Sequence, residues 1–137
     1  MPGPRQDDDP IRVLVVDDSP VVREALVAFL SEEEDLTVVG ACEDGCEVVE
    51  AATRLHPDVV FMDLSMPVMD GLSATEALRA DGSPARVIVL TAQDAGARPG
   101  AAAAGADALV PKAARTDGLL RCLRAVVSGA DGCPFCL

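Results

Sequence analysis

The chain has few cations and no long apolar run, and these two absences exclude several classes of protein. Only 11 of its 137 residues are lysine or arginine, against 23 aspartates and glutamates, so the net charge is −12. Nucleic acid and anionic lipid would both repel such a domain, and we expect it to bind neither directly. No apolar run approaches the roughly 18 residues of a membrane span, and the acidic residues 1–10 do not resemble a signal peptide. We therefore expect a cytoplasmic protein.

Lysine and histidine each occur only once. Lys112 is the single lysine beside ten arginines. An ammonium placed just after a strand-like run suggests a site that uses a compact point charge and not a planar guanidinium. The single histidine, His56, stands directly before Pro57, and we predict that it ends a helix and is not a catalyst.

Cysteine is present in an odd number and in no complete metal-binding pattern. Of the five cysteines, Cys42, Cys46, Cys122, Cys133 and Cys136, we expect most to be small buried apolar residues. Cys133 and Cys136 form a C-x₂-C pair that superficially resembles a redox motif or half of a zinc site. A structural zinc needs four ligands, and the sequence has no second such pair, so we expect no thiol or zinc function.

Short apolar runs alternate with stretches of helical periodicity along the chain. The predicted strands are 11–16, 36–42, 58–63, 86–91 and 108–111. The predicted helices follow Ser19 and Asp44 and then cover about 72–80, 101–104 and 115–128. This (βα)5 alternation predicts an α/β fold with a doubly wound parallel sheet of strand order 2-1-3-4-5, as in flavodoxin-like proteins. We divide the chain into an acidic flexible tail (1–10), a folded domain (11–128) and a tail containing Cys-Pro-Phe-Cys (129–137).

The segment 94–104 is a weak helix former at its start. Pro99 disfavours the helical region for Arg98, and Gly100 costs about 1 kcal/mol relative to alanine. We therefore expect the fourth helix to be short or mobile. Pro111 lacks an N–H group, which is tolerable if the fifth strand lies at an edge of the sheet.

Four apolar runs end at polar residues that the predicted topology brings together. These residues are Asp17 and Asp18, Asp63, Thr91 and Lys112. In the predicted strand order, ligands bind beyond the carboxyl ends of the strands, between the first and the third. Three clustered carboxylates repel one another unless a cation joins them, and their hard oxygens suit Mg²⁺. A phosphoryl group on one carboxylate could then be neutralised by Mg²⁺ and the lysine, with a hydrogen bond from the threonine.

The motifs VVDDSPVVREAL, DVVFMDLSMPVMDG, VIVLTA and GADALVPKAA resemble those of the receiver domain of two-component response regulators. The resemblance covers about residues 11–128. It implies a phosphoprotein that is no enzyme beyond possible autophosphatase activity, in which Asp63 accepts a phosphoryl group from a sensor histidine kinase in a phosphorelay. It implies that Thr91 and Lys112 bind the phosphoryl oxygens. The implied Mg²⁺ ligands are three carboxylates and one backbone carbonyl: Asp17, Asp18, Asp63 and Ser65.

The resemblance also implies an output surface made of the fourth helix, the fifth strand and the fifth helix, where we expect weak or phosphorylation-dependent homodimers. Leu109 stands where the family usually has an aromatic residue, and Ala113 stands where a proline is common. Only nine residues follow Ser128. We expect either a stand-alone regulator that contacts a downstream protein, or a receiver whose DNA-binding output domain is missing.

Other interpretations of the same residues stay open at this point. Asp17 and Asp18 could merely cap a helix, and Lys112 could be a solvated surface charge. A haloacid-dehalogenase-type phosphotransferase also uses a strand-end aspartate with Mg²⁺, but it needs two aspartates one residue apart, and here they are adjacent. A receiver-like interaction module that works without phosphorylation is the main alternative.

Overall fold

The predicted alternation is present in the computed structural model of the chain, which describes residues 9–64, 66, 68–92, 97–111, 116–129, 135 and 137. The strands are β1 (Ile11–Val16), β2 (Leu36–Cys42), β3 (Val59–Asp63), β4 (Arg86–Thr91) and β5 (Ala108–Pro111). The α-helices are α1 (Pro20–Ser31), α2 (Val48–Leu55), α3 (Gly71–Ala80), α4 (Arg98–Ala104) and α5 (Thr116–Ser128), and a 3₁₀ turn, η1 (Gly45–Glu47), precedes α2. Among these residues, no helix is long and apolar enough to cross a membrane.

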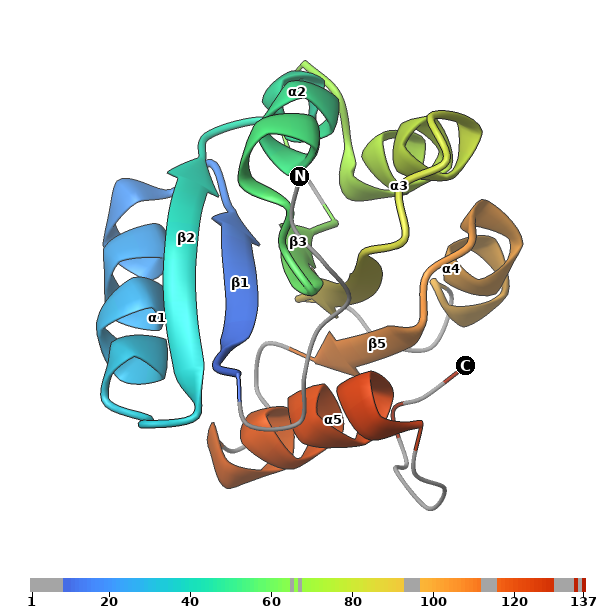
Figure 1. Cartoon of the computed structure of the whole chain (residues 1–137). Helices are drawn as coiled ribbons and strands as arrows, with labels where there is room; N and C mark the ends of the chain where they lie inside the picture. The colour runs from blue at the N-terminus through green and yellow to red at the C-terminus, as the bar shows by residue number, and fades with distance from the viewer. Residues whose placement is uncertain are drawn as a thin grey trace.

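The strands form one parallel sheet in the order β2-β1-β3-β4-β5, which confirms the predicted topology. Helices α1 and α5 cover one face of the sheet, and α2, α3 and α4 cover the other (Figure 1). Alternate residues of each strand enter the two cores, as the period of two requires. Leu14 and Met62 lie in the core beneath α2 and α3, whereas Val15 and Phe61 lie in the core beneath α1 and α5.

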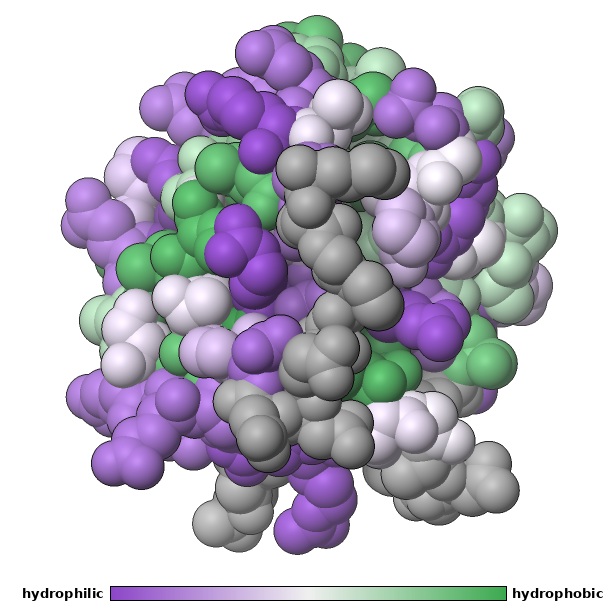
Figure 2. Space-filling model, viewed as in Figure 1, coloured by the Kyte–Doolittle hydropathy of each residue, from purple (hydrophilic) through white to green (hydrophobic). Residues whose placement is uncertain are grey.

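Hydrophilic residues dominate the rim of the face in Figure 2, and hydrophobic residues occupy smaller areas between them. Among the described residues, Val21 of α1 and Val68 of the β3–α3 loop are the most exposed large apolar residues, at 77% and 78%. Both residues belong to segments that follow the carboxyl ends of β1 and β3.

The structure confirms the predicted helix ends, which are formed by side-chain caps and by residues in the left-handed conformation. The Ser19 hydroxyl accepts a hydrogen bond from the Val22 N–H group, and Pro20 follows at the first helical position. Asp44 caps η1. His56 ends α2 in the left-handed conformation (φ 52°), and Gly105 ends α4 in the same region (φ 98°). The histidine is therefore a helix-terminus residue, as predicted.

Helix α4 is short, with seven residues, but it starts earlier than predicted. The expectation that Pro99 excludes Arg98 from the helix is wrong, because Arg98 is the first helical residue. Pro99 falls in the first turn, where a missing N–H group costs no hydrogen bond. Ala101 and Ala104 are buried and attach the helix to the domain.

Candidate functional site

The parallel register aligns the carboxyl ends of the central strands. Val16 pairs with Met62, so the next residues, Asp17 and Asp63, leave neighbouring strands at the same level. On the other side, Asp63 pairs with Leu90, the residue before Thr91. The polar residues at these strand ends therefore share one edge of the sheet.

Three carboxylates meet at this edge. Asp17, Asp18 and Asp63 each offer an oxygen atom, and these three atoms lie within 4.8 Å of one another. Asp17 and Asp63 are buried, at 1% and 3% exposure, whereas Asp18 is exposed. Like charges at this separation favour a bound cation, and carboxylate oxygens suit a hard divalent ion such as Mg²⁺.

The turn after β1 holds Asp17 in place through main-chain contacts. Its Oδ1 accepts from the Ser19 N–H group (2.9 Å), and its own N–H group donates to the Cys42 carbonyl (3.1 Å). Arg23 Nη1 donates to the Asp17 carbonyl oxygen (2.7 Å). The sequence did not identify Arg23 as part of this region, because its role depends on how α1 lies against the end of β1.

Asp44 holds the β3–α3 loop from the neighbouring β2–α2 connection. Its carboxylate accepts from the N–H groups of Cys46 (3.2 Å), Val68 (3.0 Å) and Met69 (2.9 Å). Burial alone would raise the pKa of Asp44, but these N–H donors outweigh it and lower the pKa below its ordinary value. The sequence indicated Asp44 only as the start of a helix. The contacts with the loop span more than twenty residues of chain and have no local sequence signal.

Two glycines allow the same loop to pack closely. A side chain at Gly71 would collide with the Asp63 carbonyl oxygen, and a Cβ atom at Gly45 would lie 2.5 Å from the Met69 carbonyl oxygen. The Gly71 N–H group also donates to the Leu64 carbonyl (2.9 Å). The absence of a Cβ atom at both positions thus lets α3 begin directly beside Asp63.

Thr91 is buried at the end of β4, at 2% exposure. The other predicted phosphoryl-binding residue, Lys112, and the predicted carbonyl ligand, Ser65, lie outside the described residues, as does Ala113. Leu109 is buried in the core beneath α2, α3 and α4. The roles of Thr91 and Lys112 therefore stay predictions.

Among the residues that the structure describes, the carboxylate cluster contains no cysteine. Cys42 and Cys122 are buried, and Cys46 is exposed, while Cys133 and Cys136 lie outside the described residues. Burial, helped by the charge of Glu47, raises the pKa of the Cys42 thiol to about 11. This thiol is therefore protonated at neutral pH, as expected for a small apolar core residue.

A protein-family model described as the response regulator receiver domain matches residues 13–124. The chain belongs to this family. The resemblance in its motifs is thereby confirmed. In the Mycobacterium tuberculosis response regulator NarL, the receiver domain has the same fold, with a TM-score of 0.83 and 32% identity, covering 88% of this chain and 98% of that one.

Two further proteins show the range of relatives. A protein-glutamate methylesterase/protein-glutamine glutaminase of Nocardioides sp. is 40% identical over 119 residues, which are 85% of this chain and 32% of that protein. The chain thus spans about a third of the length of this relative. A CheX–CheY complex from Borrelia burgdorferi, containing BeF₃ and Mg²⁺, matches with a TM-score of 0.79 and 26% identity, covering 86% of this chain and 90% of that one.

Proposed function

We propose that this receiver domain accepts a phosphoryl group on Asp63 from a phosphohistidine of a sensor histidine kinase, in a Mg²⁺-dependent two-component phosphorelay. In this step a carboxylate oxygen of Asp63 bonds to phosphorus while the phosphorus–nitrogen bond breaks. The electron pair of that bond stays on the imidazole nitrogen, which then takes up a proton. Transfer of this kind needs positioning and charge neutralisation more than a separate base.

The observation that carries this proposal is the cluster of three carboxylate oxygens within 4.8 Å at the strand ends of a receiver domain. Asp17, Asp18 and Asp63, with the backbone carbonyl of Ser65, would hold Mg²⁺. The ion would supply positive charge against the phosphoryl oxygens. The Borrelia complex, in which BeF₃ and Mg²⁺ accompany a CheY protein, supports the same use of this fold.

Two other residues would bind the phosphoryl group from the next strands. The Thr91 hydroxyl would donate a hydrogen bond to one phosphoryl oxygen, and the Lys112 ammonium would neutralise another. Thr91 is buried at the end of β4 and directly follows Leu90, the residue that pairs with Asp63. Hydrolysis of the aspartyl phosphate would be the only activity of the domain itself.

The signal would leave through the face formed by α4, β5 and α5, in the cytoplasm. We infer protein partners and not nucleic acid or membrane, because the net charge of −12 repels both. The output would be a downstream protein or a DNA-binding domain of a longer regulator. Homodimers formed through this face would link phosphorylation to output.

The proposal is tested by incubating the protein with a small acyl phosphate and Mg²⁺ and measuring the mass of the intact chain. We expect one phosphoryl adduct on the native protein and none on Asp63→Asn. Asp58→Asn is the matched control, because Asp58 precedes the same strand at its opposite end. An unmodified native protein, or an adduct that persists in Asp63→Asn, would refute the proposal and favour a phosphorylation-independent interaction module.

A further inference from the structure

The loop between β3 and α3 carries the chain from the proposed acceptor, Asp63, to Gly71 at the start of α3. Main-chain hydrogen bonds attach both ends of this loop. The Leu64 N–H group donates to the Leu90 carbonyl of β4 (2.9 Å), and the Gly71 N–H group donates back to the Leu64 carbonyl (2.9 Å). The middle of the loop needs an attachment of its own if the residues after Asp63 are to keep one position, because loop backbone between fixed ends is otherwise mobile.

Asp44 supplies such an attachment from the β2–α2 connection. Its Oδ2 accepts from the Val68 N–H group (3.0 Å), and its Oδ1 accepts from the N–H groups of Met69 (2.9 Å) and Cys46 (3.2 Å). The Val68 side chain is exposed, so its burial contributes little to the position of this residue. The main-chain contact with Asp44 therefore holds Val68, whereas Met69 is held both by this carboxylate and by packing of its side chain against the core.

The attachment is close and leaves little room for another arrangement. Asp44 is buried, and a Cβ atom on the neighbouring Gly45 would lie 2.5 Å from the Met69 carbonyl oxygen. The N–H donors outweigh burial and hold the pKa of Asp44 below its ordinary value, so its carboxylate is ionised at neutral pH. An ionised carboxylate accepts stronger hydrogen bonds from N–H groups than a neutral acceptor does. The loop is thus held by charge-assisted hydrogen bonds in a closely packed place.

The segment from Cys42 to Asp44 contacts both parts of the chain that carry the carboxylate cluster. The Cys42 carbonyl accepts from the Asp17 N–H group (3.1 Å), whereas Asp44 accepts from the loop that follows Asp63. Two residues of one connection therefore link the β1–α1 turn to the β3–α3 loop. Among the described residues, the cluster itself consists of Asp17, Asp18 and Asp63, so Asp44 supports this site from outside and is not one of its ligands.

We propose that Asp44 is a positioning residue for Mg²⁺ binding, because it holds the β3–α3 loop from which the Ser65 carbonyl would reach the ion. The inference rests on the proposed function, in which this carbonyl is a Mg²⁺ ligand beside Asp63. A loop that is already held in one position loses less conformational entropy when the ion binds, so its affinity for the ion is higher. Removing a group that orients metal ligands typically lowers metal affinity by about 10- to 100-fold.

The test is a titration of the full chain with MgCl₂ at constant ionic strength, in which NMR shifts of amides near the cluster give the dissociation constant for Mg²⁺. Asp44→Ala removes all three acceptor contacts, and Asp44→Asn keeps one acceptor oxygen. Glu47→Gln is the charge control, because Glu47 is exposed in the same connection. Asp107→Asn is the stability control, because it weakens contacts at the opposite end of the sheet. Amide hydrogen exchange of Val68 and Met69 reports the state of the loop in each protein.

We expect the dissociation constant of Asp44→Ala to rise about tenfold, with faster exchange at Val68 and Met69. That of Asp44→Asn should rise about threefold, because one acceptor oxygen remains. Both controls should stay within about twofold of the native value, since neither changes the acceptors of the loop. The conservative variant Asp44→Asn carries the comparison if Asp44→Ala does not fold.

An unchanged Mg²⁺ affinity in both Asp44 variants would overturn the inference. An equal rise in Glu47→Gln would assign the effect to charge, and an equal rise in Asp107→Asn would assign it to general stability, so either result would also overturn it. The acyl phosphate assay on the native protein is a separate measurement. Absence of the adduct there refutes the proposed function, whereas equal Mg²⁺ affinities refute the role of Asp44.

Discussion

Charged side chains are arranged differently at the two ends of the parallel sheet. At the amino ends of the strands, acidic side chains lie against arginines. Asp107 contacts Arg79 and Arg86 there, and Asp35 contacts Arg124. At the carboxyl ends of β1 and β3, three carboxylates lie within 4.8 Å of one another. Opposite charges at the first end contribute to the stability of the fold, whereas like charges at the second end repel one another unless a cation joins them.

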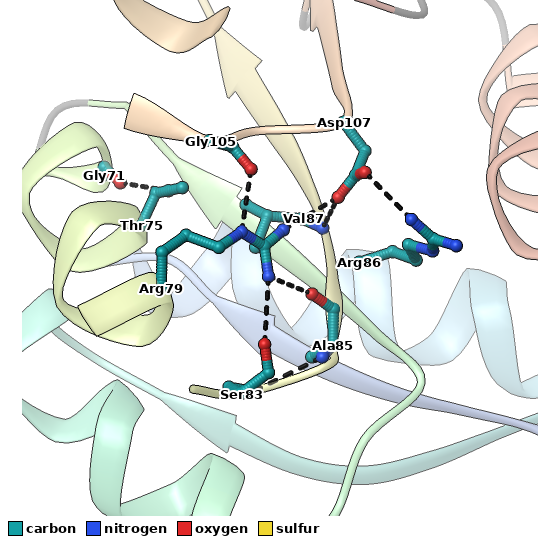
Figure 3. Close-up of polar contacts among 9 residues, drawn as sticks. All are labelled: Gly71, Thr75, Arg79, Ser83, Ala85, Arg86, Val87, Gly105 and Asp107. Atoms are coloured by element: carbon teal, nitrogen blue, oxygen red, sulfur yellow. Dashed lines mark hydrogen bonds and ion pairs between the residues drawn. The ribbon is translucent and has the colours of Figure 1, made fainter. Parts of the chain in front are cut away.

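Arg79 is the centre of the network at the amino end (Figure 3). It donates to three carbonyl oxygens of the surrounding loops, those of Gly105 (2.9 Å), Ser83 (3.2 Å) and Ala85 (2.7 Å). It also donates to Asp107 Oδ2 (2.9 Å), which accepts from the Val87 N–H group as well (2.8 Å). One arginine and one aspartate thus join α3, the α4–β5 connection and β4 at the amino end of the sheet.

The largest expected effect comes from breaking this network. Asp107→Ala removes the carboxylate that accepts from Arg79 Nη2 and from the Val87 N–H group. We expect the free energy of unfolding to fall by about 2–3 kcal/mol, measured by urea denaturation. Asp107→Asn keeps one acceptor oxygen, and we expect it to lose about half as much. Equal stability of all three proteins would mean that the amino end does not depend on its charge pairs.

The second effect concerns Asp44, whose carboxylate lies at the carboxyl end but is satisfied by main-chain N–H groups. Asp44→Ala removes the cap of η1 and the acceptor for Val68 and Met69. We expect a loss of about 1–2 kcal/mol in unfolding free energy. Faster amide exchange at Val68 and Met69 would assign this loss to the loop. A stable variant with an unchanged loop would contradict this role.

The pKa of Asp44 gives a pH dependence to the same contact. Because its folded-state pKa lies below the ordinary value of 3.8, the ionised carboxylate adds stability above that value and loses it as the pH falls below it. We therefore expect the difference in stability between the native protein and Asp44→Asn to be constant near neutral pH and to shrink below about 3.8. A stability difference that grows as the pH falls would contradict a lowered pKa of Asp44 in the folded protein.

The third effect has the opposite direction. Asp18→Asn removes one of three like charges, and we expect it to stabilise the metal-free protein by about 1 kcal/mol at low ionic strength. Thermal unfolding should show that MgCl₂ raises the melting temperature of the native protein more than that of the variant, with NaCl of equal ionic strength as reference. Asp81→Asn, at the exposed end of α3, should change neither value. Identical responses of all three proteins would show that the three carboxylates do not act as a cation site.

The smallest effect is expected at the exposed part of the amino end. Arg124 Nη2 lies 2.9 Å from both Glu33 and Asp35, but its side chain is 43% exposed. We expect Arg124→Ala to cost about 0.5 kcal/mol, and less in high salt. Arg121→Ala on the same helix is the reference substitution. A loss as large as that of Asp107→Ala would remove the distinction between exposed and half-buried pairs at this end.

Most of the fold follows from local patterns in the chain. The five strands are apolar runs bounded by polar or turn residues, and Ser19, His56 and Gly105 mark helix ends by chemistry that acts within one turn. The prediction for Arg98 was wrong because Pro99 occupies the first turn of α4, where its missing N–H group costs no hydrogen bond. The gathering of Asp17, Asp18 and Asp63 was predictable because strand order determines which strand ends are neighbours.

The amino-acid sequence by itself determined the strand and helix alternation and the residues that end each strand, because residue type and spacing act over a few positions. Only the tertiary structure decided how Asp44 holds the β3–α3 loop and how Arg79 joins three elements. These contacts join segments tens of residues apart in the chain, and folding alone brings them within hydrogen-bond distance. The sequence thus indicates the chemistry of the site, and the fold decides what holds that site.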